Sequence, residues 1–371
     1  MDPIKKPAPI LIVSSSPHIH CGDTVSAAMR DVLLALAPTI LAAVWFFRLE
    51  ALTVILACCL SAIFFEAVCQ KIMGRTITVT DGSALLTGLL LALCLPPGFS
   101  PVLAIFGTFC AIVIGKQVFG GLGSNIFNPA HIGRAILLSS MPQQMTTWLP
   151  PTPSFLDTLT KSFSASVSSI AATTQATQAV NAATYATKPA VDAVSAATPL
   201  AMLRMSETLW QKGQDATASL PNLASMFIGN IPGSLGETSV PLILLGGLFL
   251  IWRGRIDWRI PFYYILTVFI ITGVYGYFRG YIPLFPLYHL LGGGLLIGAF
   301  FMATDWVTSP LTKRGRIIFA VGLGILTALI RLRGGYVEGV CYSILIMNML
   351  TPLIDRYILT IPFGGGMKKH E

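Results

Sequence analysis

Three acidic side chains lie in or beside long apolar runs, where a carboxylate can act on ions. They are Glu66, Asp305 and Glu338. Charged side chains are costly inside a bilayer and usually serve a function there, so each is a candidate for coupling to ion movement. Asp305 ends an apolar run beside the hydroxyls of Thr304 and Thr308. Oxygen ligands of this kind suit a hard cation such as Na⁺, as they suit Ca²⁺ and Mg²⁺.

Two of these acids also allow a structural interpretation. Asp305 could cap the turn that leads to Lys313, and Glu338 could pair with Arg331 or Arg333. The sequence shows no nucleophile paired with a general base, and its five histidines have no metal-ligand spacing. We therefore expect no catalytic residue and no metal site in this chain.

A glycine-rich loop with two asparagines is a second candidate site. It runs from Gly120 and Gly121 past Asn125 and Asn128 to Ala130. The glycines do not match G-x-G-x-x-G and no strand precedes them, so a dinucleotide fold is not indicated. The loop is either a tight break between half-helices or the wall of a cavity for a planar ring. Irregular backbone at membrane depth lines a cavity or is buried in protein.

The composition is that of a membrane protein. Of the 371 residues, 54% are hydrophobic and 11% are charged, whereas soluble domains have roughly 25% charged residues. The apolar runs approach the roughly 20 residues that cross a bilayer as a helix. The formal net charge is +8, but most Lys and Arg stand at the ends of apolar runs, which indicates membrane orientation rather than nucleic-acid binding. No short apolar stretch with a cleavage site precedes the first run, so we expect no cleaved signal peptide.

The apolar runs fall into two sets around a hydrophilic middle. The expected membrane segments are 32–48, 51–72, 84–96, 101–118 and 127–140, then 240–252, 261–278, 284–304, 316–331 and 338–359. Several are short and interrupted by Gly or Pro at matching places in the two sets, which is typical of inverted repeats with half-helices. The predicted fold is an all-α polytopic membrane protein with about ten transmembrane segments in two inverted five-segment repeats.

The same pattern predicts domain boundaries and orientation. We expect a cytoplasmic N-terminal segment (1–31), a first membrane repeat (32–140), a middle segment (141–239), a second membrane repeat (240–359) and a cytoplasmic tail (360–371). Lys and Arg are more numerous in the loops on the side of both termini, and such residues favour the cytoplasm. The middle segment is therefore expected on the extracytoplasmic side.

A polar run in the middle segment resembles a cofactor-attachment motif. The run is Asp192-Ala193-Val194-Ser195-Ala196-Ala197-Thr198. It resembles the flavin-attachment motif Asp-x-x-Ser/Thr-Gly-Ala-Thr of membrane subunits of Rnf and sodium-pumping NADH:quinone reductase complexes, in which the last threonine carries FMN through a phosphoester. The resemblance implies covalent FMN on Thr198, with Asp192, Ser195 and Ala197 in the attachment motif. Ala196 stands in place of the motif glycine.

Longer strings carry the same resemblance over nearly the whole chain. They are Ser14–Ile19 (SSSPHI), Gly120–Ala130 (GGLGSNIFNPA), Pro232–Ser239 (PGSLGETS), Phe301–Asp305 (FMATD) and Gly334–Val340 (GGYVEGV). Their content and order are similar to the D subunit of the Rnf ion-translocating ferredoxin:NAD oxidoreductase complex, a relative of the B subunit of the sodium-pumping reductase. Trp306 stands where we expect a proline after the Thr-Asp pair.

The resemblance implies one step in an electron relay. The chain is expected to be a membrane electron carrier, without a complete active site of its own, in a complex that couples electron transfer between ferredoxin and NAD to Na⁺ or H⁺ movement. The implied location is the bacterial cytoplasmic (inner) membrane. The implied partners are other membrane, flavin and iron–sulfur subunits and a flavin transferase. The 120–130 loop would then line a site for a second redox ring beside the covalent FMN, either riboflavin or another flavin or a quinone-like ring.

Two alternatives stay open at the level of the sequence. One is the B subunit of a sodium-pumping NADH:quinone reductase, which shares the attachment motif but usually has a longer N-terminal extension. The other is a passive small-solute channel, because inverted repeats with half-helices suit a channel and the architecture of this family resembles that of urea transporters. A channel does not need the attachment motif, so the motif favours the electron carrier.

Overall fold

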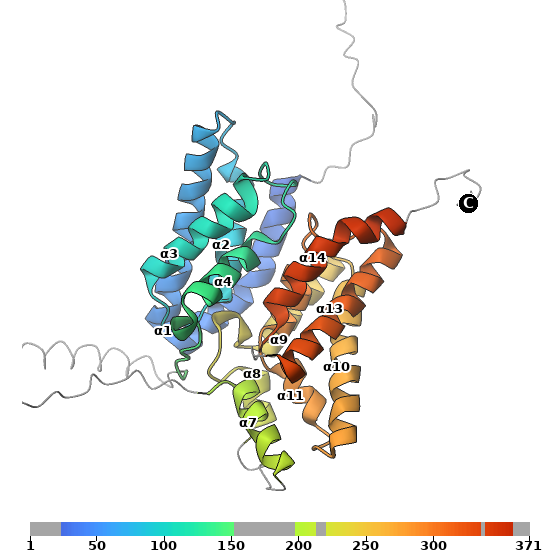
Figure 1. The fold of residues 1–371 in the computed structure, drawn as a ribbon. Coiled ribbons are helices and arrows are strands. Elements are labelled where there is room, and N and C mark those ends of the chain that lie inside the picture. Colours follow the sequence, from blue (N-terminus) through green and yellow to red (C-terminus); the bar gives the residue numbers. More distant parts are fainter. Residues whose placement is uncertain (1–23, 152–196, 213–219, 335–337, 359–371) are drawn as a thin grey trace, which may run out of the picture.

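The computed structural model describes residues 24–151, 197–212, 220–334 and 338–358, and every regular element in these ranges is a helix (Figure 1). The helices form two bundles side by side. One bundle runs from α1 (Val25–Ile72) to α4 (Pro129–Ser140), and the other from α9 (Val240–Trp252) to α14 (Val340–Tyr357). Between them in sequence, α7 (Pro199–Gln211) and α8 (Leu223–Ile228) lie at one end of the pair.

The first bundle begins with a long helix that breaks once. α1 leaves helical geometry at Arg48, where φ is 56° and ψ is −130°. This break separates the two predicted segments 32–48 and 51–72. The other elements are η1 (Val79–Asp81), α2 (Ser83–Leu93), α3 (Pro101–Phe109), the π-helical η2 (Cys110–Gln117) and, after α4, the short α5 (Pro142–Met145). Proline begins both α3 and α4, where its fixed φ suits the first helical position.

The second bundle follows the predicted segments closely. The predicted segment 240–252 coincides with α9. The other elements are η4 (Leu235–Glu237) before α9, then α10 (Arg259–Arg279), α11 (Phe285–Leu291), α12 (Leu295–Ile297), the π-helical η5 (Gly298–Met302) and α13 (Lys313–Arg333). α11 and the run from α12 through η5 meet at an angle of 62°. The glycines 292–294 lie at this bend, so the single predicted segment 284–304 is a broken helix.

Length separates full spans from shorter apolar helices. Among the described helices, α1, α10 and α13 are long and apolar enough to cross a bilayer, and the bent pair is a fourth candidate. α2, the α3–η2 pair and α9 are apolar but have only 10–17 residues. At about 1.5 Å per residue they are shorter than a hydrocarbon core of about 30 Å. The helices are those of a multi-pass membrane protein, while the ten crossings and their inverted repeat stay a prediction.

The two bundles share one apolar core. Its buried side chains come from α1, α2, α9, η5 and α13, among other elements. α9 can approach α1 because Gly246 has no side chain: a Cβ there would lie 2.1 Å from the Ala35 carbonyl oxygen. Outside this core, large apolar side chains are exposed, Leu60 and Phe64 on α1 and Trp252 on α9 among them. A surface of this kind suits lipid or partner subunits rather than water.

Candidate functional site

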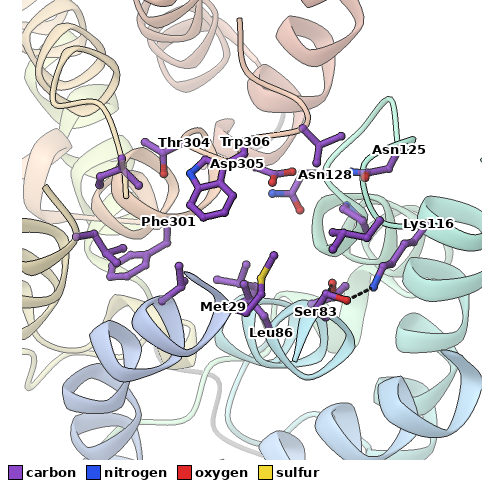
Figure 2. A pocket seen from close by; sticks show the side chains of 18 of the residues that line it. Met29, Ser83, Leu86, Lys116, Asn125, Asn128, Phe301, Thr304, Asp305 and Trp306 are labelled. Atoms are coloured by element: carbon purple, nitrogen blue, oxygen red, sulfur yellow. Dashed lines mark hydrogen bonds between the residues drawn. The ribbon is translucent and has the colours of Figure 1, made fainter. Parts of the chain in front are cut away.

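A cavity lies between the two bundles, next to the ends of both π-helical stretches. Its volume is about 90 Å³, and it is partly open to the outside. Figure 2 labels ten of the lining residues: Met29, Ser83, Leu86, Lys116, Asn125, Asn128, Phe301, Thr304, Asp305 and Trp306. A largely apolar wall with a few polar groups is typical of small-molecule sites, and the lining of this cavity has that character.

The glycine-rich loop contributes its asparagines to the cavity but not its glycines. Asn125 and Asn128 are lining residues, whereas Gly120 and Gly121 are not. The glycines have φ angles of +123° and +96°, a left-handed backbone that lets the loop turn sharply. Asn128 caps α4 with its side-chain oxygen and donates its amide to the Met302 carbonyl oxygen at 3.3 Å. It therefore ties the loop to η5 of the other bundle.

Glu66 lies behind the cavity wall, where its carboxylate accepts hydrogen bonds from three side chains. Lys116 Nζ donates to both carboxylate oxygens, at 2.9 and 2.8 Å, and to Ser83 Oγ at 2.7 Å. The amides of Gln70 and Gln117 each donate to Glu66 Oε1 at 3.2 Å. Glu66 and Lys116 are each 1% exposed. The acid predicted as an ion-coupling candidate is thus neutralised by a buried lysine.

Asp305 lines the cavity directly. Its Oδ2 accepts the Thr308 hydroxyl at 3.2 Å, which fits the turn-capping interpretation. The Thr304 hydroxyl donates instead to the Phe300 carbonyl oxygen at 2.7 Å, so only one of the two neighbouring hydroxyls contacts the carboxylate. Burial raises the pKa of Asp305 above its ordinary value, although the Thr308 hydrogen bond and the Lys116 charge act in the opposite direction.

Replacing Asp305 with asparagine tests whether this carboxylate takes part in ion coupling. Asparagine keeps the size of the side chain and an oxygen for Thr308 but removes the charge. On the electron-carrier interpretation of the sequence, we expect the variant to assemble into its complex while electron-driven uptake of Na⁺ or H⁺ into membrane vesicles falls to background. Thr308→Val is the matched control, since it breaks the turn contact and keeps the charge. Normal ion uptake by an assembled Asp305→Asn complex would remove Asp305 from the candidates.

Glu338 pairs with an arginine of the other bundle, and the predicted partners Arg331 and Arg333 are wrong. Its carboxylate forms an ion pair with Arg134 of α4. Arg331 uses its Nε to donate to the Glu338 backbone carbonyl at 2.8 Å instead. A second acid, Glu237 of η4, is 5% exposed and close enough for its charge to interact with Glu338 and Arg134. Glu338 reaches Arg134 because α14, which begins two residues after Glu338, packs against α4 across the boundary between the bundles.

Thr198 begins the helix that the middle segment contributes. It is the N-cap of α7, its Oγ1 accepts the backbone amide three residues later at 3.2 Å, and Pro199 follows at the first helical position. Both residue types are preferred at these places. The side chain is half-buried. Of the other residues of the attachment motif, the structure describes Ala197, whereas Asp192 and Ser195 lie outside the described residues.

Apolar contacts hold α7 against the second bundle. Leu200 and Leu203 are buried in a small core with side chains of α8 and α11. Gly293 makes room for this contact, because a Cβ there would lie 2.6 Å from Leu200 Cδ1. Arg204 donates a hydrogen bond to the carbonyl oxygen of Gly334, just past α13. The start of α7 therefore has a fixed place relative to the membrane helices.

Thr198 and the cavity lie near opposite ends of α13. The cavity includes Asp305, in the turn before α13, and α7 is bonded to Gly334, after it. α13 has 21 residues, which at 1.5 Å per residue is about 30 Å. Figure 1 shows α7 at the end of the bundles where α13 finishes.

Most lining residues of the cavity are not among the site residues that the sequence predicts, and Lys116 and Trp306 are two of them. Lys116 stands out in the sequence only as a basic residue near the end of the segment 101–118, although its position inside that apolar run is a signal. Trp306 stands out only as a departure from the expected proline. Its indole Nε1 donates to the Arg255 carbonyl oxygen at 2.6 Å, and its ring is part of the cavity wall (Figure 2).

Metal-binding chemistry has no evident place in the described part of the chain. No group of three or more His, Cys, Asp or Glu side chains there could hold an ion. The described cysteines are free, and all but Cys69 are buried. The chemistry available to the described residues is therefore that of a polar-lined cavity, buried ion pairs and a threonine hydroxyl.

Comparison with known proteins identifies the family. The sequence model of the NQR2, RnfD, RnfE family matches residues 12–364. The D subunit of a proton-translocating ferredoxin:NAD(+) oxidoreductase complex from Clostridium ljungdahlii is 45% identical over 96% of this chain and 96% of its own length. The D subunit of a Na(+)-translocating ferredoxin:NAD(+) oxidoreductase complex from Acetobacterium woodii is 40% identical over 97% and 98%. The D subunit of an ion-translocating oxidoreductase complex from Escherichia coli is 37% identical over 95% and 98%. The chain therefore belongs to the NQR2, RnfD, RnfE family of ion-translocating oxidoreductase subunits.

Proposed function

We propose that this chain is the membrane electron-carrier subunit of an Rnf-type complex and carries FMN covalently on Thr198. The relatives named above are subunits of complexes that move ions and, in two cases, connect ferredoxin with NAD(+). The observation that carries the proposal is the place of Thr198: a hydroxyl at the start of a docked helix, at the end of a motif-like run. The chain acts as one part of a translocase.

The residues around Thr198 fit a phosphoester. The hydroxyl is half-buried and accepts the N-cap hydrogen bond of its own helix. A phosphate on this oxygen would lie at the amino end of α7, where free backbone amides and the helix dipole favour negative charge. FMN supplies one- and two-electron chemistry. The chain supplies the attachment point and, through the contacts of α7, its position.

The cavity is proposed as the site of riboflavin, another second flavin or a quinone-like ring. Its aromatic walls Phe301 and Trp306 and the amides of Asn125 and Asn128 suit a planar ring with polar edges. Carriers in partner subunits, with flavins and iron–sulfur centres, are part of the proposal, as is a flavin transferase that loads Thr198.

The alternatives are less well supported. A passive small-solute channel does not account for relatives that are named as oxidoreductase subunits. The B subunit of a sodium-pumping NADH:quinone reductase is the nearer alternative, because the family model also covers NQR2. The three relatives described above are all named as D subunits, which favours the Rnf-type assignment.

Intact mass tests the proposed function most directly. The full chain, co-expressed with a flavin transferase and purified under denaturing conditions, is expected to be heavier by one FMN minus one water. The same chain made without the transferase is the control and is expected at its unmodified mass. An unmodified mass in both preparations would contradict a covalent carrier.

The proposed orientation puts the middle segment outside the cytoplasm. A cysteine placed at Ser166, outside the described residues, is expected to react with a membrane-impermeant thiol reagent in intact cells. A cysteine in place of Lys313, at the start of α13, is expected to react only after the membrane is opened. The parent chain without either substitution gives the background from its own cysteines. The reverse pattern would overturn the orientation and external flavin attachment with it.

A further inference from the structure

Lys116 stands between the cavity and Glu66. Lys116 and Ser83 line the cavity, whereas Glu66 is not a lining residue (Figure 2). The lysine ammonium is bonded to both Glu66 oxygens and to Ser83 Oγ, all within 2.9 Å. One positive charge is thus placed at the boundary between a buried carboxylate and the space proposed for a second redox ring.

Glu66 would keep an oxygen-rich cage without the lysine. The amide nitrogens of Gln70 and Gln117 each lie 3.2 Å from Glu66 Oε1. The Ser83 hydroxyl contacts the Lys116 ammonium, which in turn contacts Glu66. The Gln70 oxygen already accepts the Thr78 backbone amide at 2.9 Å, whereas the Gln117 amide can turn to present its oxygen. Carboxylate, hydroxyl and amide oxygens are the ligands that hard cations prefer. The place of the ammonium would therefore suit Na⁺, and the carboxylate itself would suit a proton.

We propose that Lys116 is a charge switch that couples reduction of a ring in the cavity to uptake of a monovalent cation at Glu66. The inference rests on the second redox ring proposed above. A buried charge is strongly unfavourable without a partner. The single ammonium of Lys116 cannot neutralise both the Glu66 carboxylate and a reduced, negatively charged ring. Each electron added to the cavity places a negative charge beside Lys116, where charges attract strongly because water is excluded. Lysine has a flexible stem and can turn towards it.

The step balances in charge. One electron enters the cavity from the preceding carrier of the relay, and one cation enters at Glu66 as Lys116 turns away. The buried region therefore keeps its net charge. When the electron passes to the next carrier, Lys116 returns to Glu66 and displaces the cation. No covalent bond of the lysine forms or breaks, and only its hydrogen bonds change.

Three other titratable side chains face this switch. Asp81 of η1 accepts the Ser83 hydroxyl at 2.7 Å. Asp305 lines the cavity and is influenced by the Lys116 charge. Cys69 lies on the same helix as Glu66 and is influenced by its charge. All three stay unchanged in the variants below, so a change in cation dependence would belong to the Lys116–Glu66 pair.

The test is a redox titration of riboflavin bound to the purified full chain. Thr198→Val is used as the parent, so that no covalent flavin contributes, and quenching of riboflavin fluorescence first measures binding. Cation uptake on reduction stabilises the reduced form, so the midpoint potential is expected to rise with cation concentration. The limit is about 59 mV per tenfold for one cation and one electron. Varying Na⁺ at fixed pH, and pH at fixed Na⁺, shows which cation enters.

The deciding variant is Glu66→Gln with Lys116→Met in the same chain. It removes both charges together, so no buried charge is left unpaired and the fold is kept. The double variant is compared with the parent at saturating riboflavin, because Lys116 lines the cavity and its loss is expected to weaken binding. We expect the cation dependence to fall, in the pH series to the slope of riboflavin's own protonation. Lys71→Met, which removes an exposed lysine from the last turn of α1, is expected to behave as the parent.

The outcomes separate the switch from the second ring. A cation dependence that is unchanged in the double variant, or that is absent from the parent, overturns the switch and leaves the ring in place. Failure of the parent to bind riboflavin overturns the second ring and the switch together. Loss of the dependence in the double variant alone supports both.

Discussion

The Thr198→Val chain is expected to lose its covalent flavin completely. Valine has nearly the shape of threonine but no hydroxyl, so it cannot form the phosphoester. After expression with the flavin transferase, the denatured wild-type chain should fluoresce in a gel under ultraviolet light, and the variant should be dark. Loss of the N-cap hydrogen bond would also weaken α7, by about 0.5–2 kcal/mol. That loss alone must not be mistaken for loss of the attachment site.

Two controls separate the cap from the attachment. Thr312 caps α13 in the same way, with its Oγ1 accepting from the Gly315 amide at 3.0 Å. Thr312→Val therefore removes a comparable cap and should leave fluorescence intact. Thr198→Ser keeps both the hydroxyl and the cap, and should retain flavin. Persistent fluorescence in Thr198→Val would move the attachment elsewhere, with Thr184 as the next candidate because it ends the similar run Asn181-Ala182-Ala183-Thr184.

Apolar runs and their interruptions predicted most of the described helices. α9 coincides with its predicted segment, and α10 exceeds the predicted 261–278 by a few residues. These helices have apolar runs with clear ends, so local sequence suffices to place them. The structure adds the bend at Gly292–Gly294. The length of an apolar run does not tell whether the helix within it is continuous.

The contacts between helices could not be predicted in the same way. Glu66 and Lys116 are 50 residues apart, and Arg134 and Glu338 are 204 apart. The sequence places each residue on a helix, but which helices pack together depends on close contacts such as Gly246 against α1. Spacing along the chain favoured a local partner for Glu338. The distant arginine is the partner because α4 reaches α14 across the boundary between the bundles.

Exchanging Arg134 for methionine is expected to destabilise the contact between the bundles. Methionine fills much of the same space but has no charge, so Glu338 loses its ion-pair partner and the buried Glu237 loses a nearby positive charge. Removing one partner of a buried ion pair costs about 3–5 kcal/mol. We expect a lower midpoint of thermal unfolding in detergent and less assembled protein. Arg333→Met removes an exposed charge at the end of α13 and should change stability by less than about 0.5 kcal/mol.

A double variant shows whether the loss comes from the stranded carboxylate. If it does, adding Glu338→Gln to Arg134→Met should recover part of the stability, because residues in contact couple by about 0.5–3 kcal/mol. Recovery should be partial, since Glu237 keeps its carboxyl group at the same place. A double variant no more stable than Arg134→Met would mean that the arginine stabilises by packing. An Arg134→Met chain as stable as Arg333→Met would mean that the bundles are held together by their apolar core alone.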